Sequence, residues 1–387
     1  MIHAEAPEVM IIGAGPAGST MACILARRGR RVMLVDRNSF PRAKVCGCCL
    51  APTGRRILRD LELDEITRPG IPLQTAVIQS SGCRQRLDFD GSVVLSRAAL
   101  DLGLIEAANA AGAVFQPRTR GRVTPDDRVM LEDLDHPDHG PTSIQPEAIV
   151  VADGLGGRSL DDRPEFTWKT RRRNRFGVGS VVEATEDAPP PGELLMIANR
   201  TGYLGVVRLE DGRVDLAAAL HAGRTRRAGG PAQACAALLE QADRPQLATV
   251  ARTTRWQGTP ALTRTRRTVA HGRVLCIGDA SGYVEPFTGE GMSWGMLAAV
   301  KAASHVEAII NGELETGWNR THHRLLRSRQ RRCRAVSLAM RFPGFSLAGM
   351  SILGRLPGIG PRLAGLASGH PGTDFKRTAS RNPEVIA

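Results

Sequence analysis

Three glycines at residues 13–18 (GAGPAG) have the spacing of a turn that can bind phosphate groups. The apolar residues 9–12 precede them as a short strand would, and a helix-forming segment follows. Gly13 permits a tight turn, Gly15 lets a pyrophosphate approach the backbone, and Gly18 lets the helix pack closely on the strand. The free N–H groups and the dipole at the start of that helix attract the same pyrophosphate. The pattern therefore predicts a dinucleotide-binding strand–helix–strand unit.

An acidic residue stands where the second strand of this unit should end. Residues 31–35 have the character of a strand, and Asp36 follows them directly. A carboxylate at that place can accept hydrogen bonds from the hydroxyl groups of an adenosine ribose. The alternative is an ordinary glycine turn, but strand, helix and acid together favour a dinucleotide.

A second segment, far along the chain, offers another carboxylate and another helix start. Asp279 follows a predicted strand at residues 274–277, which would place it at the carboxyl edge of a sheet. Gly289 and Gly291 then precede a predicted helix that runs to Ile310. The positive end of such a helix would stabilise the negative charge of a reduced flavin. Taken alone, Asp279 could equally be a helix cap.

Four segments together resemble the flavoproteins with the aromatic-hydroxylase type of fold, a superfamily of flavin hydroxylases, geranylgeranyl reductases and flavin halogenases. The matching segments are GAGPAG with Asp36, residues 40–47 (FPRAKVCG), residues 152–154 (ADG), and Gly278-Asp279 with residues 286–291 (PFTGEG). Residues 95–101 match more weakly, and the resemblance spans about residues 8–310. It implies FAD as the cofactor, with binding residues Gly13, Gly15, Ala17, Gly18, Asp36, Arg37, Arg97, Asp279, Gly289, Gly291 and Met292.

The middle of the chain has the pattern of a separate antiparallel sheet. Residues 80–82 and Asp211-Gly212 are hairpin turn signals between segments that look extended. The predicted strands are residues 74–79, 84–89, 176–184, 193–198, 203–209 and 214–220.

The predicted fold is therefore α/β with two domains: a Rossmann-like FAD-binding domain of the glutathione-reductase type and an inserted antiparallel-sheet substrate domain, followed by a helical C-terminal tail. The sheet would cover the flavin. The predicted ranges are 1–73, 97–165 and 268–310 for FAD binding, 74–96 and 166–267 for substrate, and 311–387 for the helical and apolar tail.

The chain has one glycine fingerprint rather than two, so the electron donor, NADPH or NADH, is expected to bind transiently. The resemblance implies either hydroxylation with oxygen or reduction of a double bond. Cys46 matches a cysteine that faces the substrate in geranylgeranyl reductases, which makes it the candidate catalytic residue. Those reductases typically carry a Tyr-x-Trp-x-Phe-Pro segment, whereas residues 203–208 read YLGVVR. We therefore expect a monooxygenase of a lipophilic aromatic or polyketide-type substrate. The alternatives are an ene-reductase of prenyl double bonds, and a non-catalytic FAD carrier or membrane-associated scaffold.

Cys46, Cys48 and Cys49 raise the question of a metal. Zinc needs about four ligands, and no second cysteine pair or well-spaced histidine pair lies near them in the sequence. No metal site is therefore predicted.

Charge and hydropathy bear on partners and location. The net charge of +13 comes mainly from arginine, but aromatic residues make up only 4%, so stacking platforms for nucleic acid are scarce and no such partner is expected. The arginine-rich residues 324–334 lead into the uncharged residues 342–354. This pattern suits contact with a membrane surface or an acidic carrier protein, the lining of an apolar substrate channel, or packing on the chain's own domain. With no signal segment or spanning run, the expected location is cytoplasmic, with peripheral membrane contact as an option.

Overall fold

The computed structural model describes residues 6–80, 83–170, 175–284 and 290–325. A six-stranded sheet carries the glycine turn at its carboxyl edge, and its neighbouring strands are parallel except for one antiparallel pair at the end, β18 with β19. Its order is β18 (Ala270–His271), β19 (Val274–Cys276), β10 (Ala148–Val151), β1 (Val9–Ile12), β2 (Val32–Val35) and β6 (Val114–Gln116).

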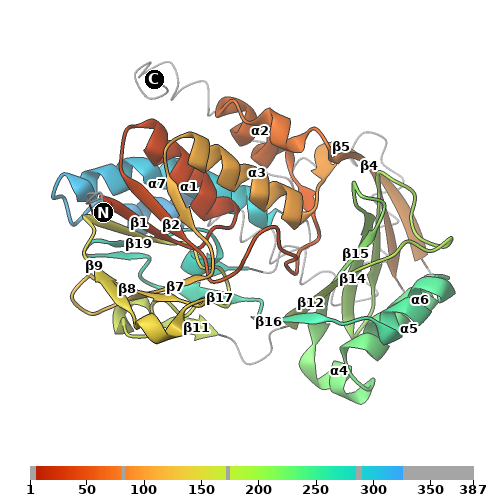
Figure 1. Cartoon of the computed structure of the whole chain (residues 1–387). Coiled ribbons are helices and arrows are strands. Elements are labelled where there is room, and N and C mark those ends of the chain that lie inside the picture. The colour runs from red at the N-terminus through yellow and green to blue at the C-terminus, as the bar shows by residue number, and fades with distance from the viewer. Residues whose placement is uncertain (1–5, 81–82, 171–174, 285–289, 326–387) are drawn as a thin grey trace.

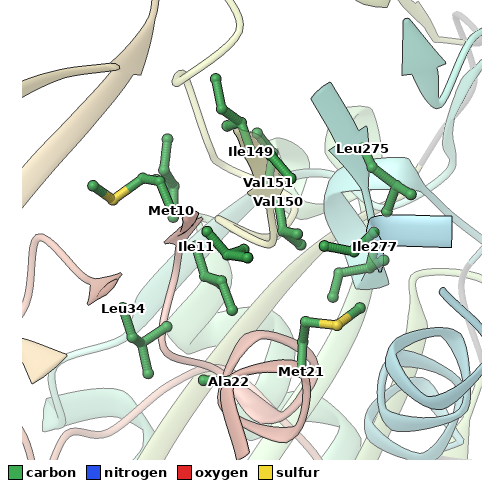
Figure 2. Close-up of a cluster of buried hydrophobic side chains, with 14 of the residues drawn as sticks. Met10, Ile11, Met21, Ala22, Leu34, Ile149, Val150, Val151, Leu275 and Ile277 are labelled. Atoms are coloured by element: carbon green, nitrogen blue, oxygen red, sulfur yellow. The ribbon is translucent and has the colours of Figure 1, made fainter. Parts of the chain in front are cut away.

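The centre of this sheet is buried on both faces, as the unbroken apolar run of β1 requires. Figure 2 shows side chains of its strands gathered with Met21 and Ala22 of helix α1 (Pro16–Arg27). Helix α7 (Gly291–Ile310) packs beside α1, and α3 (Arg97–Ala110) lies on the other side of α1 (Figure 1). A three-stranded meander covers the opposite face with Val123, Val129 and Leu131, and it consists of β7 (Thr119–Val123), β8 (Val129–Asp133) and β9 (Thr142–Ile144).

A second, eight-stranded sheet stands beside the first layer (Figure 1). Its inward face looks onto the carboxyl edge of the six-stranded sheet, and its outward face packs against α5 (Pro231–Gln241) and α6 (Pro245–Thr253), next to the short α4 (Ala222–Arg227). These three helices were not predicted from the sequence. The strand order is β16 (Gln257–Ala261), β12 (Arg175–Val182), β15 (Val214–His221), β14 (Gly202–Arg208), β13 (Glu193–Ala198), β4 (Ile71–Ser80), β5 (Cys83–Val94) and β3 (Cys49–Leu50).

The remaining elements connect the two layers. Helix α2 (Pro52–Asp60) packs on α7, and a small sheet joins β11 (Trp168–Thr170), β17 (Arg264–Arg266) and β20 (Gly282–Tyr283). Four short 3-10 turns complete the described chain: η1 (Asp64–Thr67), η2 (Pro137–His139), η3 (Pro164–Phe166) and η4 (Gly278–Ser281).

The α/β fold and the predicted strands are confirmed, with one difference in the second sheet. That sheet was predicted to be antiparallel, but β4 and β13 run parallel. The reason is that no hairpin joins them: β4 turns back into β5, and more than a hundred residues later β13 pairs with the free side of β4. The proposed domain ranges stay a prediction, although β3 shows that the 1–73 segment also contributes a strand to the eight-stranded sheet.

Three predicted features lie wholly or partly outside the described residues. They are residues 81–82 of the predicted hairpin turn, residues 286–289 of the matching segment with Gly289, and the basic and apolar C-terminal segment beyond Leu325. Within the described ranges, every helix is too short or insufficiently apolar to cross a lipid bilayer.

Candidate functional site

The glycine turn that follows β1 has no room for side chains at Gly13 and Gly18. Gly13 has a φ of 109°, and its N–H donates a 2.7 Å hydrogen bond to the carbonyl of Val35. A Cβ atom on Gly13 would lie 2.4 Å from the carbonyl oxygen of Ala152, and one on Gly18 would lie 1.9 Å from the carbonyl oxygen of Gly13. The backbone therefore forms a tight, open cradle at this point, as the glycine spacing predicted.

The first turn of α1 faces cationic side chains. Gly15 is the N-cap of α1 with extended backbone, Pro16 follows it, and no described side chain caps the helix, so its first N–H groups stay available. The nearest atoms to a Cβ built on Gly15 are guanidinium nitrogens of Arg97 at 3.6 Å and Arg42 at 4.0 Å. Backbone donors, a helix dipole and two guanidinium groups together suit the two charges of a pyrophosphate.

Asp36 ends β2 as predicted and is held in a fixed orientation. Its Oδ2 accepts the N–H of Ala14 at 2.9 Å, and its Oδ1 accepts the backbone N–H and the side-chain amide of Asn38 at 2.9 and 2.8 Å. Arg42 approaches Oδ2 at 3.4 Å. These donors use the acceptor positions of the carboxylate. We therefore expect the Asn38 amide or Arg42 to move away from the Asp36 carboxylate when a ribose hydroxyl binds to it.

The two glycine segments predicted to share one site do meet in the fold. A Cβ on Gly278 would lie 2.9 Å from the Cβ of Ala17, and a Cβ on Gly295 of α7 would lie 3.3 Å from that same atom. Residue Ala17 thus packs between the turn that carries Asp279 and the first turns of α7. The close packing needs small residues in both segments, and it places Asp279 beside the start of α1.

Three charged side chains face one another near this edge. Arg97 is buried and donates two hydrogen bonds, of 2.9 and 2.7 Å, to the carboxylate of Asp101. Burial lowers the pKa of Lys44, and the neighbouring Arg97 lowers it further, whereas Asp279 partly opposes this. Burial raises the pKa of Asp279, and the charges of Lys44 and Arg97 oppose that shift. A polar group bound here can therefore interact with either a cationic side chain or a carboxyl group.

Two adjacent cavities lie along this edge. The outer cavity, of about 670 Å³, extends over Gly13, Gly15, Asp36 and Arg37. The inner cavity, of about 190 Å³, is lined at its base by Cys46, Arg97, Asp279, Gly291 and Met292. The two share the lining residues Lys44, Val45, Leu155 and Thr259. The predicted site residues within the described chain therefore line these cavities, except Ala17 and Gly18, which shape the edge by packing.

Cys46 lies in the inner cavity, where the resemblance had placed it. Its Sγ is 3.8 Å from the Sδ of Met292, at the start of α7. A hydrogen bond from Cys48 lowers the pKa of the Cys46 thiol; burial opposes this, and the charge of Arg97 lowers the pKa further. The lowered pKa favours the thiolate form of Cys46, and the residue lines the inner cavity, where a ligand can bind.

The residues that form the roof of the inner cavity were not predicted from the sequence. Strands β13, β14 and β15 supply Leu194, Met196, Tyr203, Gly205, Val207, Asp215, Ala217 and Ala219. The available signal was the position of Asp215 within β15, where it is the single acidic residue and the residues from Leu216 to Leu220 are apolar.

The residues of this site fit FAD. The Gly13–Gly18 cradle, the arginines at Gly15 and the acid at the end of β2 can hold the adenosine diphosphate part along the outer cavity. The start of α7, with Asp279 and Arg97, can hold the polar edge of a flavin at the inner cavity.

Comparisons with known proteins agree with this site. The family described as FAD binding domain matches residues 6–339. Kynurenine 3-monooxygenase of Stenotrophomonas maltophilia is 28% identical over 338 residues, covering 79% of this chain and 73% of that protein. Menaquinone reductase of Mycobacterium tuberculosis is 27% identical over 380 residues, covering 88% and 86%. A crystal structure of a flavoprotein/dehydrogenase from Cytophaga hutchinsonii superposes with a TM-score of 0.80 at 14% identity, covering 95% of this chain and 93% of that one.

Proposed function

This chain belongs to the FAD-binding-domain family and is an FAD-dependent oxidoreductase, and from that premise we propose that it takes a hydride from NADPH or NADH and hydroxylates a lipophilic aromatic or polyketide-type substrate. FAD supplies the redox chemistry, because its reduced ring can pass electrons to oxygen or a hydride to a polarised double bond.

The observation that carries this proposal is the inner cavity itself. It lies next to the outer, nucleotide-sized cavity, with which it shares four lining residues, and its roof is mostly apolar, with Leu194, Met196 and Val207. An apolar wall excludes water and favours an aromatic or alkyl ligand over a polar one. The relationship to a kynurenine 3-monooxygenase further supports oxygen-atom transfer.

The chain's own residues have separable tasks in this scheme. The glycine cradle and Arg42 bind the pyrophosphate, and Asp36 orients the ribose. Arg97, fixed by Asp101, holds its charge at the inner cavity, where negative charge on a reduced cofactor needs a partner. The roof strands exclude water from the reacting face.

A second candidate is the reduction of a prenyl or quinone double bond. Two observations favour it: the half-buried Cys46 faces the cavity, and the menaquinone reductase relative matches 88% of this chain. Sulfur atoms of Cys46, Cys49, Met196 and Met292 also line the cavity, and they would be exposed to oxidation in an enzyme that activates oxygen.

One experiment separates the candidates. The purified protein, yellow with bound FAD, is bleached by NADPH without oxygen and then given an alkylresorcinol, a naphthoquinone or a prenyl lipid. Reoxidation that requires oxygen and yields a hydroxylated alkylresorcinol supports the monooxygenase. Reoxidation without oxygen that yields a naphthoquinone or prenyl lipid product with a reduced carbon–carbon double bond supports the reductase. A colourless protein that neither binds FAD nor is stabilised by it would contradict both candidate reactions and would favour a role as a non-catalytic scaffold.

A further inference from the structure

Asp215 is the only carboxyl that the described roof strands present to the inner cavity. Along β15 the residues Asp215 and 217–219 line the cavity, whereas Leu216 and Leu220 pack toward α5 and α6. These alanines leave open space, so the acid stands at one end of a row of small side chains.

The carboxyl group of Asp215 has an unused position. The residue is only 3% exposed, and its Oδ2 has no hydrogen-bond partner among the described residues. Its neighbour is the thiol of Cys48, a weak donor, and no described cation forms a salt bridge with it. A buried polar atom without a partner is costly, so its persistence beside a cavity indicates a ligand that completes it.

The protonation of Asp215 follows from these surroundings. Burial raises its pKa well above the usual range, the charge of Cys46 raises it further, and the hydrogen bond from Cys48 opposes the shift. A neutral carboxylic acid at neutral pH offers one O–H donor to a ligand.

We propose that Asp215 recognises the substrate by donating a hydrogen bond to an oxygen acceptor, such as a carbonyl or quinone oxygen, on an otherwise apolar ring system. The inference rests on the proposed function in that it takes the inner cavity as the substrate site. It names the substrate class more narrowly: a lipophile with an oxygen at the end that lies under the start of β15. Residues Leu194, Met196 and Val207 would contact the rest of the molecule.

The cavity would therefore distinguish between ligands by the presence of an oxygen acceptor rather than by their size. A site that provides a buried hydrogen bond rejects an analogue that lacks the matching atom, because its own polar group is then left unpaired. Asp215 therefore acts as a specificity-determining residue.

The test measures binding to the FAD-loaded protein with two probes of the same ring skeleton, 2-methyl-1,4-naphthoquinone and 2-methylnaphthalene. We expect the native chain to bind the quinone at least about tenfold more tightly than the hydrocarbon. Asp215→Leu should abolish this preference by weakening quinone binding alone. Asp215→Asn, which keeps an N–H donor, should retain most of it.

The matched control is Glu193→Gln. Glu193 is a buried carboxylate of the same sheet, but it pairs with Arg86 at 3.5 Å and does not line either cavity, so its removal should leave the preference unchanged. A second readout is the infrared C=O band of a protonated carboxyl at neutral pH. It should vanish in Asp215→Asn and shift when the native chain binds the quinone.

The inference is overturned if the native chain shows no preference, including no binding of either probe, or if Asp215→Leu keeps the preference. An absent infrared band would also overturn it.

Failure of this inference is distinguishable from failure of the proposed function. A chain that retains FAD and accepts hydride from NADPH, but shows no preference, refutes only the role of Asp215. A chain with the preference that accepts no hydride refutes only the redox proposal.

Discussion

At Gly18, the carbonyl oxygen of Gly13 occupies the space that the side chain of any other residue would need. A Cβ atom on Gly18 would lie 1.9 Å from that oxygen. No rotamer change relieves a clash between a Cβ and a backbone atom. The start of α1 must therefore move if Gly18 is replaced, and its N–H groups then no longer point at the pyrophosphate.

We expect Gly18→Ala to lose bound FAD, measured as flavin absorbance per mole of purified protein. The control is Gly223→Ala in α4, where a Cβ would meet only the His221 ring at an ordinary 3.8 Å. A folded Gly18→Ala protein that retains FAD like the control would refute the assigned role of the cradle.

Cys46 is the second residue whose behaviour can be measured directly. Because the hydrogen bond from Cys48 lowers its pKa, with Arg97 adding to the effect against the opposing effect of burial, Cys46 loses its proton at a lower pH than an ordinary cysteine. The rate of alkylation by iodoacetamide should therefore rise with a midpoint below the usual ~8.5. Peptide mapping identifies the labelled thiol, and Cys46→Ser should remove the low-pH phase. A midpoint at or above the ordinary value would contradict the assignment.

At the scale of secondary-structure elements, α3 depends on a buried ion pair. Ser96 caps the helix by accepting the N–H of Ala99, and one turn later Arg97 and Asp101 form their two hydrogen bonds with almost no exposure to solvent. Arg42 also approaches Asp101 at 3.8 Å. The Asp101 carboxylate therefore pairs closely with Arg97 and lies near Arg42, whose nearer carboxylate partner is Asp36 at 3.4 Å.

Asp101→Asn should lower the free energy of unfolding by about 3–5 kcal/mol, because it leaves the buried Arg97 without its counter-charge. Urea denaturation of the FAD-free protein measures this. The control is Glu65→Gln, which breaks the exposed Arg68–Glu65 pair and should cost at most about 1 kcal/mol. Equal, small losses in both variants would show that the Asp101 pair contributes little.

At the scale of the whole molecule, the buried Asp215 links overall stability to pH. In the unfolded chain this carboxyl titrates near ~3.9, but burial raises its pKa in the folded chain well above that, with Cys46 adding to the shift and Cys48 opposing it. Between these two pKa values the folded state holds a proton that the unfolded state has lost. The free energy of unfolding therefore falls as the pH rises through this range, by at most about 1.4 kcal/mol per pH unit.

Asp215→Asn removes this titration, so it should become more stable relative to the native chain as the pH is raised from about 5 to about 8. Urea unfolding of the two FAD-free proteins at both pH values measures the difference. Glu193→Gln serves as the comparison, since its carboxylate is paired with Arg86. A difference between the native and Asp215→Asn chains that does not change with pH would be contrary to the prediction. The groups that face Asp215 are the thiols Cys46, Cys48 and Cys49.

The sequence by itself determined the local parts of this protein. The glycine spacing at residues 13–18, the acid after β2 and the helix after Gly291 follow from backbone geometry and short-range periodicity, which neighbouring residues specify. The strands at residues 9–12 and 193–198 could be predicted for the same reason.

Only the tertiary structure decided what depends on contacts between distant segments. The packing of Ala17 against Gly278 and Gly295, and the parallel pairing of β4 with β13, join residues whose separation along the chain carries no local signal. The same holds for Asp215. Its alternation within β15 is visible in the sequence, but whether that face meets solvent or a cavity depends on which layer packs against the sheet.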